Sequence, residues 1–358
     1  MIRVLHIVNL MNRGGIETYI MNVYRSINRN QIQFDFIVNV NERCDYDDEI
    51  EALGGKIYHI PRKKDSIIKN LISIYKIVKE NNYKVVERHG DNAIMFLDVL
   101  AAKIGGAKKV IVHSHSINTS LPKIHKIFYP FLNLLSFQRL ACSEDAAKWM
   151  FGNKQYILIR NAIDVSKFKF NQEIREDLRR RYNLSGKIVI GHVGRFTSAK
   201  NHYFLIEIFR NLYSLNSNCV LMLIGRGELE TEIKKKITDY GLENNVMFMG
   251  VRSDVNKLMQ AMDCFVLPSL FEGLGIVLIE AQASGLRCFA SDTVVPKEAQ
   301  VTDLLEYIPL SNTPMQWAEK ILASLPYNRR DTYTEIKDAG YDIQTLALKL
   351  SQIYSEEN

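Results

Sequence analysis

Two glutamates with glycines between them form the most distinctive local pattern in the sequence. Seven residues separate Glu272 from Glu280, and Gly273 and Gly275 are among them. The apolar run after Gly275 predicts a helix, whose first turn offers unpaired N–H groups and a positive dipole end that suit a phosphate. Glu280 lies about one and a half turns further on, where a carboxylate is costly without a partner such as a ribose hydroxyl. An ordinary strand-to-helix turn is the alternative.

A second pattern places two cations in one loop, Gly194–Asn201. The loop follows an expected strand, so it lies at the carboxyl edge of a sheet, where open α/β sheets bind ligands. Arg195 suits bidentate phosphate contact and Lys200 supplies a point charge. The G-x-x-x-x-G-K-[ST] spacing of a P-loop is absent. A solvated basic loop is the alternative.

Gly14 and Gly15 follow the first expected strand and could cradle an anion. The G-x-G-x-x-G dinucleotide fingerprint is missing. His113 and His115 end a later strand and share one face. No third His or Cys lies near them in sequence, so zinc is disfavoured and a substrate-contacting histidine is favoured over a merely polar strand end.

One acidic pattern is interpreted as surface rather than as a metal site. Asp45-Tyr46-Asp47 is a D-x-D, which some sugar transferases use to hold a divalent ion. Here it opens the acidic stretch 45–51, which predicts a solvated face before a short helix. We therefore expect no metal.

Alternating strands and helices must position these residues. Apolar runs predict strands, and apolar spacing of three and four predicts helices. Strands are expected at 4–8, 34–38, 84–87, 109–113, 187–193, 220–224, 246–249, 264–267 and 287–290, and helices at 16–27, 67–79, 93–104, 203–212 and 275–283. This order predicts two doubly wound α/β domains in series, with a boundary after Asn161–Asp164.

Composition sets the broader class. The 358 residues predict about two domains, and 47% hydrophobic with 24% charged residues exclude a disordered chain or a fibre. Five cysteines without a C-x-x-C pair indicate reduced thiols in a cytosolic protein. We expect neither a signal peptide nor a membrane span.

Charge is uneven along the chain. Residues 1–164 hold 23 basic and 16 acidic side chains, a net charge of +7, whereas residues 165–358 hold 23 and 24, a net charge of −1. The basic half suggests an anionic partner, and an anionic membrane is favoured because no aromatic-interleaved basic motif points to nucleic acid. The basic residues expected to contact the membrane are Arg62, Lys63, Lys64, Lys123 and Lys126. Surplus surface lysines are the alternative, and the apolar segment 127–135 is expected to be a packed helix rather than a membrane contact.

Taken together, these residues resemble a retaining GT-B glycosyltransferase of the family 4 type over essentially the whole chain. The most specific part is Glu272–Glu280, and the other motifs occur in the family's order. The opening of the chain and the His113–His115 stretch look most like enzymes that build capsular or exopolysaccharide repeat units. The resemblance implies two Rossmann-like domains facing across a cleft: an acceptor-binding domain, 1–165, and a nucleotide-sugar-binding domain, 166–340. A C-terminal helix within 341–356 would cross back to the first domain.

The resemblance also implies residue roles. Arg195 and Lys200 would hold the donor diphosphate, Glu272 and His115 would contact the transferred sugar, and Glu280 would bind the ribose. The other implied donor-binding residues are Gly14, Gly15, Gly194, Arg252, Gly273, Leu274, Gly275, Ile276 and Val277. His113 and Asn161 are candidates on the acceptor side. With two cations present no metal or other cofactor is required, and retention would follow from front-face attack assisted by the leaving phosphate.

The expected reaction is transfer of a hexose-type sugar from a nucleotide diphosphate sugar, a UDP-sugar, to a polysaccharide precursor linked to a lipid. The protein would be cytoplasmic, with peripheral contact to the membrane. Two alternatives stay open: a nucleotide-sugar epimerase of the same architecture, and a non-catalytic nucleotide- or glycan-binding protein. Asn201 departs from the family pattern, because glycine usually follows the lysine.

Overall fold

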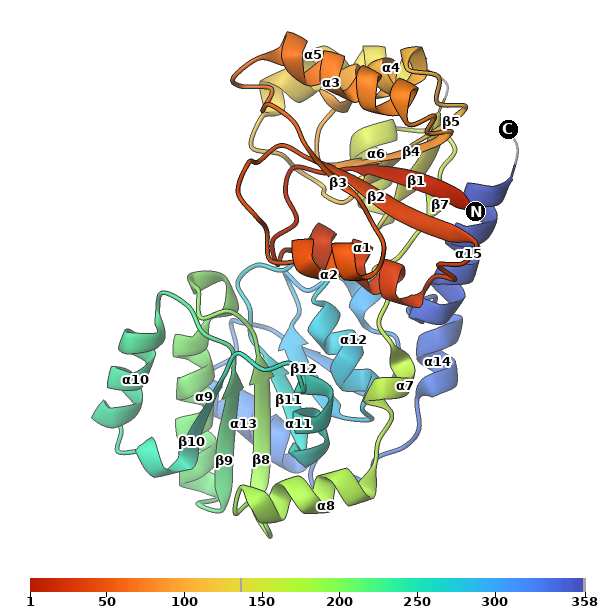
Figure 1. Cartoon of the computed structure of the whole chain (residues 1–358). Coiled ribbons are helices and arrows are strands. Elements are labelled where there is room, and N and C mark those ends of the chain that lie inside the picture. Colours follow the sequence, from red (N-terminus) through yellow and green to blue (C-terminus); the bar gives the residue numbers. More distant parts are fainter. Residues whose placement is uncertain (136, 357–358) are drawn as a thin grey trace. The chain divides into compact units, whose positions relative to one another are not determined.

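The computed structural model describes residues 1–135 and 137–356. The chain forms two compact units. The N-terminal unit comprises Met1–Ile163 and the segment that starts at Asp342, and the C-terminal unit comprises Asp164–Tyr341. Each unit is a parallel sheet with helices on both faces (Figure 1).

Within the described residues, the N-terminal unit has a seven-stranded sheet in the order β3-β2-β1-β4-β5-β6-β7. Its strands are β1 Ile2–Ile7, β2 Ile32–Val38, β3 Ile57–His59, β4 Val85–Gly90, β5 Lys109–Ser114, β6 Gln138–Ala141 and β7 Ile157–Leu158. Its helices are α1 Gly15–Ser26, α2 Asp47–Ala52, α3 Ile67–Glu80, α4 Met95–Ile104, α5 Pro122–Leu134, α6 Glu144–Phe151 and α15 Ile343–Ser355. All seven residues of β2 are buried, as expected for a parallel strand covered on both faces.

Strand register determines which polar side chains meet inside this unit. His6 of β1 is the pairing partner of Glu87 of β4, and His89 of β4 is the partner of His113 of β5. Side chains two residues apart on a strand share a face. Glu87, His89 and His113 therefore project from the same face of the sheet as His6.

The terminal helix α15 completes the N-terminal unit although it follows the C-terminal unit in sequence. Ile343, Leu346, Leu350 and Ile353 are buried in the same core as α1 and β2. The ammonium group of Lys109 donates to the carbonyl of Ile353 at 2.5 Å, which holds the end of the helix against β5. The expected terminal helix is confirmed.

The C-terminal unit has a six-stranded parallel sheet in the order β10-β9-β8-β11-β12-β13. Its strands are β8 Ile188–Val193, β9 Cys219–Ile224, β10 Val246–Gly250, β11 Cys264–Leu267, β12 Arg287–Ser291 and β13 Leu305–Ile308. Its α-helices are α7 Val165–Phe168, α8 Gln172–Arg181, α9 His202–Leu215, α10 Glu230–Asp239, α11 Val255–Ala261, α12 Ile276–Ala283, α13 Pro314–Ala323 and α14 Tyr333–Asp338. The expected fold class, two Rossmann-like units built on parallel sheets, is confirmed.

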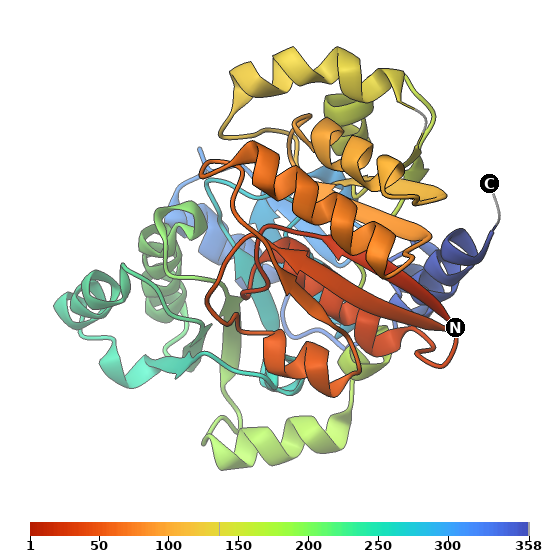
Figure 2. The same ribbon diagram turned by 45° about the horizontal axis from the view of Figure 1, so that its top comes forward.

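The helices α3, α4 and α5 lie side by side on one face of the N-terminal sheet (Figure 2). Their outer surface carries large apolar side chains that are exposed. These are Ile67, Ile68 and Ile72 of α3, Leu100 and Ile104 of α4, and Ile127, Phe131 and Leu134 of α5. None of the described helices is long and apolar enough to cross a membrane.

Candidate active site

In the C-terminal unit, the 194–201 loop and the 268–275 loop lie in direct contact. The backbone N–H of Leu270 donates to the carbonyl of Ala199 at 2.8 Å. The ammonium group of Lys200 donates to Glu272 Oε1 at 2.6 Å, and the Ser269 hydroxyl donates to the same oxygen at 2.7 Å. The Glu272 side chain is only 6% exposed. The structure therefore brings together Lys200 and Glu272, which the sequence placed in separate motifs, and adds Ser269, which sequence reasoning missed.

The departure at Asn201 has a backbone explanation. Asn201 has φ 53° and ψ 46°, the left-handed conformation between the short 3-10 turn Ser198–Lys200 and α9. Glycine adopts this conformation without strain, and asparagine tolerates it better than most residues. The Asn201 amide also donates to the carbonyl of Pro268 at 3.0 Å. Asparagine thus keeps the turn and adds a tie to the 268–275 loop.

The 194–201 loop also packs tightly against the turn after β9. Gly225 has φ 133°, and a side chain there would overlap the carbonyl group of Gly194. A side chain at Gly227 would overlap the backbone of Phe196. The segment Gly225-Arg226-Gly227 is therefore a tight turn, and its two glycines allow the close backbone approach to the 194–201 loop.

Glu280 projects from α12 without a partner. Gly275 has φ 71° and ψ 52° and caps the helix, which begins at Ile276. No described residue forms a hydrogen bond or ion pair with the Glu280 carboxyl group. Burial raises the pKa of this carboxyl to about 7. A partly buried carboxyl group that no described side chain binds is a candidate to receive ligand hydroxyls.

The remaining candidates of this unit are more open. Arg195 is 76% exposed and lies 3.8 Å from Glu228, so its guanidinium is available to a ligand. Arg252 follows β10 and binds Asp254 through two hydrogen bonds of 2.8 Å. Gly273 has open space where a side chain would be. Leu274, Ile276 and Val277 surround the first turn of α12, as the sequence predicted.

In the N-terminal unit, four histidines and one glutamate form a histidine cluster: His6, His89, His113, His115 and Glu87. Hydrogen bonds of 2.9 Å join His6 Nδ1 to His89 Nε2 and His89 Nδ1 to His115 Nε2. A third, also 2.9 Å, joins His113 Nδ1 to Glu87 Oε1. Burial lowers the pKa of His6 to about 4 and of His113 to about 3, and lowers the pKa values of His89 and His115 as well. All four imidazoles are therefore neutral near pH 7.

The start of α1 lies beside this cluster. Gly14 is the N-cap of α1, and a side chain at Gly15 would meet nothing. Tyr19, one turn into the helix, has its ring centroid 5.3 Å from that of His113 and 5.4 Å from that of His115. The structure thus brings the Gly14-Gly15 helix start and both predicted histidines together. Asn161 follows β7 and its buried Oδ1 has no partner among the described residues.

One supporting argument and one expectation need revision. The argument against a metal rested on the lack of a third ligand near His113 and His115. The fold supplies one, because the ligand atoms of His89, His113 and His115 all lie within 4.8 Å of one another. The expectation of a solvated D-x-D is also wrong for Asp47, which is buried and accepts from the backbone N–H of Cys44 at 2.8 Å. Asp47 holds the turn before α2, since a buried carboxylate must be paired.

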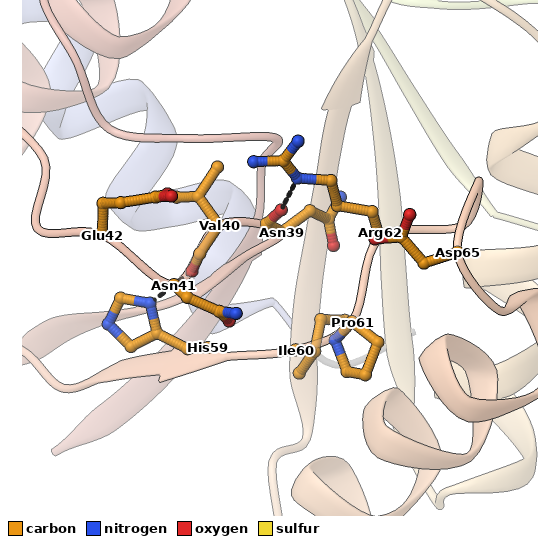
Figure 3. Close-up of a pocket in the computed structure, with 9 residues that line it drawn as sticks. All are labelled: Asn39, Val40, Asn41, Glu42, His59, Ile60, Pro61, Arg62 and Asp65. Carbon is orange, nitrogen blue, oxygen red and sulfur yellow. Dashed lines mark hydrogen bonds between the residues drawn. The ribbon is translucent and has the colours of Figure 1, made fainter.

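A separate pocket lies where β2 and β3 end (Figure 3). Arg62 Nε donates to the carbonyl of Asn39 at 3.1 Å, and His59 Nδ1 contacts the carbonyl of Val40 at 2.6 Å. Of the residues that line it, the sequence singled out only Arg62, as one of the basic positions and not as a donor- or acceptor-binding residue. The pocket is therefore not assigned to the site above.

Comparison with known proteins decides the family. Residues 174–341 match the model of the glycosyl transferases group 1, and residues 6–171 match the glycosyl transferase 4-like model. The putative glycosyltransferase EpsF of Bacillus subtilis is 36% identical over 99% of this chain and 96% of its own length. The chain belongs to this glycosyltransferase family. The predicted resemblance is confirmed.

Two further proteins are similar to this chain over most of its length. A UDP-Gal:alpha-D-GlcNAc-diphosphoundecaprenol alpha-1,3-galactosyltransferase of Escherichia coli is 27% identical over 81% of this chain and 79% of its own length. The crystal structure of Anabaena Alr3699/HepE in complex with UDP has a TM-score of 0.79, with 17% identity over 99% of this chain and 100% of that one. At that identity the match concerns the fold, which is GT-B.

Proposed function

We propose that this glycosyltransferase moves a sugar from a UDP-sugar, with retention, to a lipid-linked precursor of a polysaccharide. The observation that carries the donor half is the open first turn of α12 beside the unpaired Glu280 carboxyl and the Lys200–Glu272 pair. Three similar proteins support the UDP-sugar donor and the lipid-linked acceptor. The structure of HepE was determined in complex with UDP, and the E. coli relative is named for transfer to a diphosphoundecaprenol-linked sugar. CapH of Staphylococcus aureus is named for capsular polysaccharide biosynthesis.

Each donor group has a distinct task in this proposal. Cleavage of the sugar–phosphate bond develops negative charge on the leaving diphosphate, and fixed cations and helix N-termini stabilise such charge best. Arg195 and Lys200 supply the cations, and the backbone of 275–277 supplies N–H groups. Glu280 receives the ribose hydroxyls. In this proposal no metal is required, because Arg195 and Lys200 supply the positive charge, and Lys200 is held in place by its 2.6 Å contact with Glu272.

The sugar-side groups complete the proposed machinery. Glu272 and His115 contact the transferred sugar, and Gly15 leaves room for the diphosphate at the start of α1. Domain roles follow from this assignment: residues 166–340 bind the donor and residues 1–165 bind the acceptor. Retention follows from attack on the face that the diphosphate leaves.

Thermal unfolding with ligands tests the donor assignment. A ligand that binds only the folded state raises the unfolding midpoint. We expect UDP and UDP-sugars to raise it more than GDP or ADP do, equally with and without EDTA, and we expect Glu280→Ala to abolish the shift. No shift with any nucleotide would overturn the proposal. A product formed from donor alone would indicate an epimerase, and binding without transfer to any acceptor would indicate a binding protein.

We further propose that the outer surface of α3, α4 and α5 contacts an anionic membrane. Exposed Ile68, Ile127 and Leu134 offer apolar contact, so the expectation that 127–135 is simply a packed helix is wrong for its outer side chains. Lys64, just before α3, and Lys126 of α5 are exposed cations. Apolar burial combined with basic residues is the usual basis of peripheral membrane binding. A cytoplasmic protein at the membrane face would meet its lipid-linked acceptor there.

Lys63 does not belong to this surface, contrary to its inclusion among the basic positions above. Its ammonium group lies 2.6 Å from Asp98 Oδ1, and Arg88 binds the same carboxylate. We expect Lys64→Gln with Lys126→Gln to reduce sedimentation with phosphatidylglycerol vesicles and to leave sedimentation with phosphatidylcholine unchanged. Equal binding of the variant and the unaltered protein to anionic vesicles would contradict the proposal.

A further inference from the structure

The histidine cluster contains a continuous chain of imidazoles that runs from the core to a partly exposed side chain. His6 is 1% exposed and His89 is 2% exposed, whereas His115 is only partly buried. The two hydrogen bonds of the chain, each 2.9 Å, use both ring nitrogens of His89. Sequence reasoning named only His113 and His115.

Counting protons leaves two possible arrangements of hydrogen atoms along the three imidazoles His6, His89 and His115. Each neutral imidazole carries one proton, and each of the two hydrogen bonds uses one. The third proton therefore lies at an end of the chain, either on His6 Nε2 or on His115 Nδ1. The two arrangements place opposite tautomers on His115.

The buried end decides between them. His6 Nε2 is fully buried and has no hydrogen-bond partner among the residues that the structure describes. It faces aromatic neighbours, since the ring centroids of His6 and Phe34 are 4.1 Å apart. A proton on this nitrogen would be an orphaned buried donor, which proteins avoid more strictly than an orphaned acceptor. The exposed end offers that proton water or a ligand instead.

We infer that His89 is a positioning residue that holds His115 as the Nδ1–H tautomer, with that N–H directed out of the chain as a hydrogen-bond donor to the transferred sugar. His6 fixes His89 in turn. His115 Nε2 accepts from His89 and is not available to a ligand. The contact with the transferred sugar rests on the proposed function, whereas the tautomer of His115 does not depend on it.

Glu87 supports the neighbouring ring of His113 and also lies 3.7 Å from His89 Nε2. It accepts from His113 Nδ1 and from the Tyr354 hydroxyl of α15, at 2.9 and 2.5 Å. The rings of His113 and His115 stack with centroids 4.0 Å apart. Packing against His113 therefore holds the plane of the His115 ring, and the hydrogen bond from His89 determines which ring nitrogen of His115 carries the proton.

Nitrogen NMR of histidine-labelled protein without ligand tests the tautomer directly. We expect His115, assigned with a His115→Gln variant, to show the Nδ1–H pattern from pH 6 to 8. His89→Ala should release it to a mixture of tautomers, and His89→Gln, whose amide can still donate, should restore it. His59→Gln, a change at an exposed histidine of β3, is the matched control. An Nε2–H tautomer in the unaltered protein would overturn the inference, and so would one equivalent of bound zinc, which would occupy these nitrogens.

Kinetics separates this inference from the proposed function. In His89→Ala we expect kcat to fall about tenfold or more, with KM for the UDP-sugar unchanged and partial rescue in His89→Gln. An unchanged kcat in His89→Ala would overturn the positioning role while leaving glycosyl transfer intact. If no UDP-sugar is turned over by the unaltered protein, the proposed function fails, and the NMR result alone decides the tautomer.

Discussion

Ionisation of Glu280 should control both donor affinity and stability, in opposite directions. Its carboxyl group has a pKa of about 7, raised from 4.5 by burial. Ribose hydroxyls donate to the ionised form, so binding requires the proton to leave. At pH 6 about one molecule in eleven carries ionised Glu280, and at pH 8 about ten in eleven do. We therefore expect the affinity for a UDP-sugar to rise about tenfold from pH 6 to pH 8, or about 1.4 kcal/mol.

The stability effect follows from the same shift. Since the folded-state pKa exceeds the unfolded value, the folded protein holds an extra proton between pH 4.5 and 7. Stability from this group is therefore full below pH 4.5, falls as the pH rises to 7, and is level above 7. Replacing the group by a neutral amide removes this loss. Glu280→Gln should be more stable than the unaltered protein at pH 8, by at most about 3 kcal/mol.

Isothermal titration with UDP-glucose and thermal unfolding, both from pH 5.5 to 8.5, measure the two effects. A nucleotide sugar is preferred to UDP, because its second phosphate is linked to the sugar and has no ionisation near neutral pH, whereas the terminal phosphate of UDP does. Glu280→Gln should bind more weakly at pH 8 and with little pH dependence, yet unfold at a higher temperature. A pH-independent affinity in the unaltered protein, or the same pH dependence in the variant, would refute the reasoning.

Three further predictions concern the contacts between the loops of the C-terminal unit. Lys200→Ala removes the cationic partner of the buried Glu272 carboxylate and leaves it only the Ser269 hydroxyl. We therefore expect a loss of up to about 3 kcal/mol in stability and about 100-fold or more in kcat; equal values for Lys200→Ala and the unaltered protein would contradict the pairing. Asn201→Val should unfold with about 1–2 kcal/mol less stability than Asn201→Gly, measured by urea denaturation, because only the valine is strained at φ 53°. Gly225→Ala should lower the thermal midpoint and abolish the UDP-induced shift, because the added methyl group overlaps Gly194; a retained shift would show that the loop tolerates the displacement.

Long apolar runs made most of the sheet predictable. The run 32–38 is buried throughout, and its β-branched and aromatic residues suit a parallel strand. The short outer strands Ile57–His59 and Ile157–Leu158 were not predicted. Two or three residues carry no periodicity, and their pairing depends on neighbours already in place.

The loops of the C-terminal unit were predictable as motifs but not as a site. Residue type and spacing indicated the cations of 194–201 and the helix start at 275, since both follow from local backbone chemistry. The contact between Lys200 and Glu272 joins positions 72 residues apart. It depends on β8 and β11 lying next to each other in the sheet, which a single sequence does not specify.

The histidine cluster could not be predicted from the sequence, because it depends on the register of the strands. His6, Glu87, His89 and His113 lie on three strands, and His115 lies one residue beyond the end of β5. Their side chains meet on one face only because His6 pairs with Glu87 and His89 pairs with His113. A shift of one residue in either pairing would turn the partner side chain to the opposite face of the sheet. The five residues come from distant parts of the sequence, and no spacing along the chain marks them as a group. A buried imidazole chain, with its single outward proton, therefore follows from strand pairing and not from spacing along the chain.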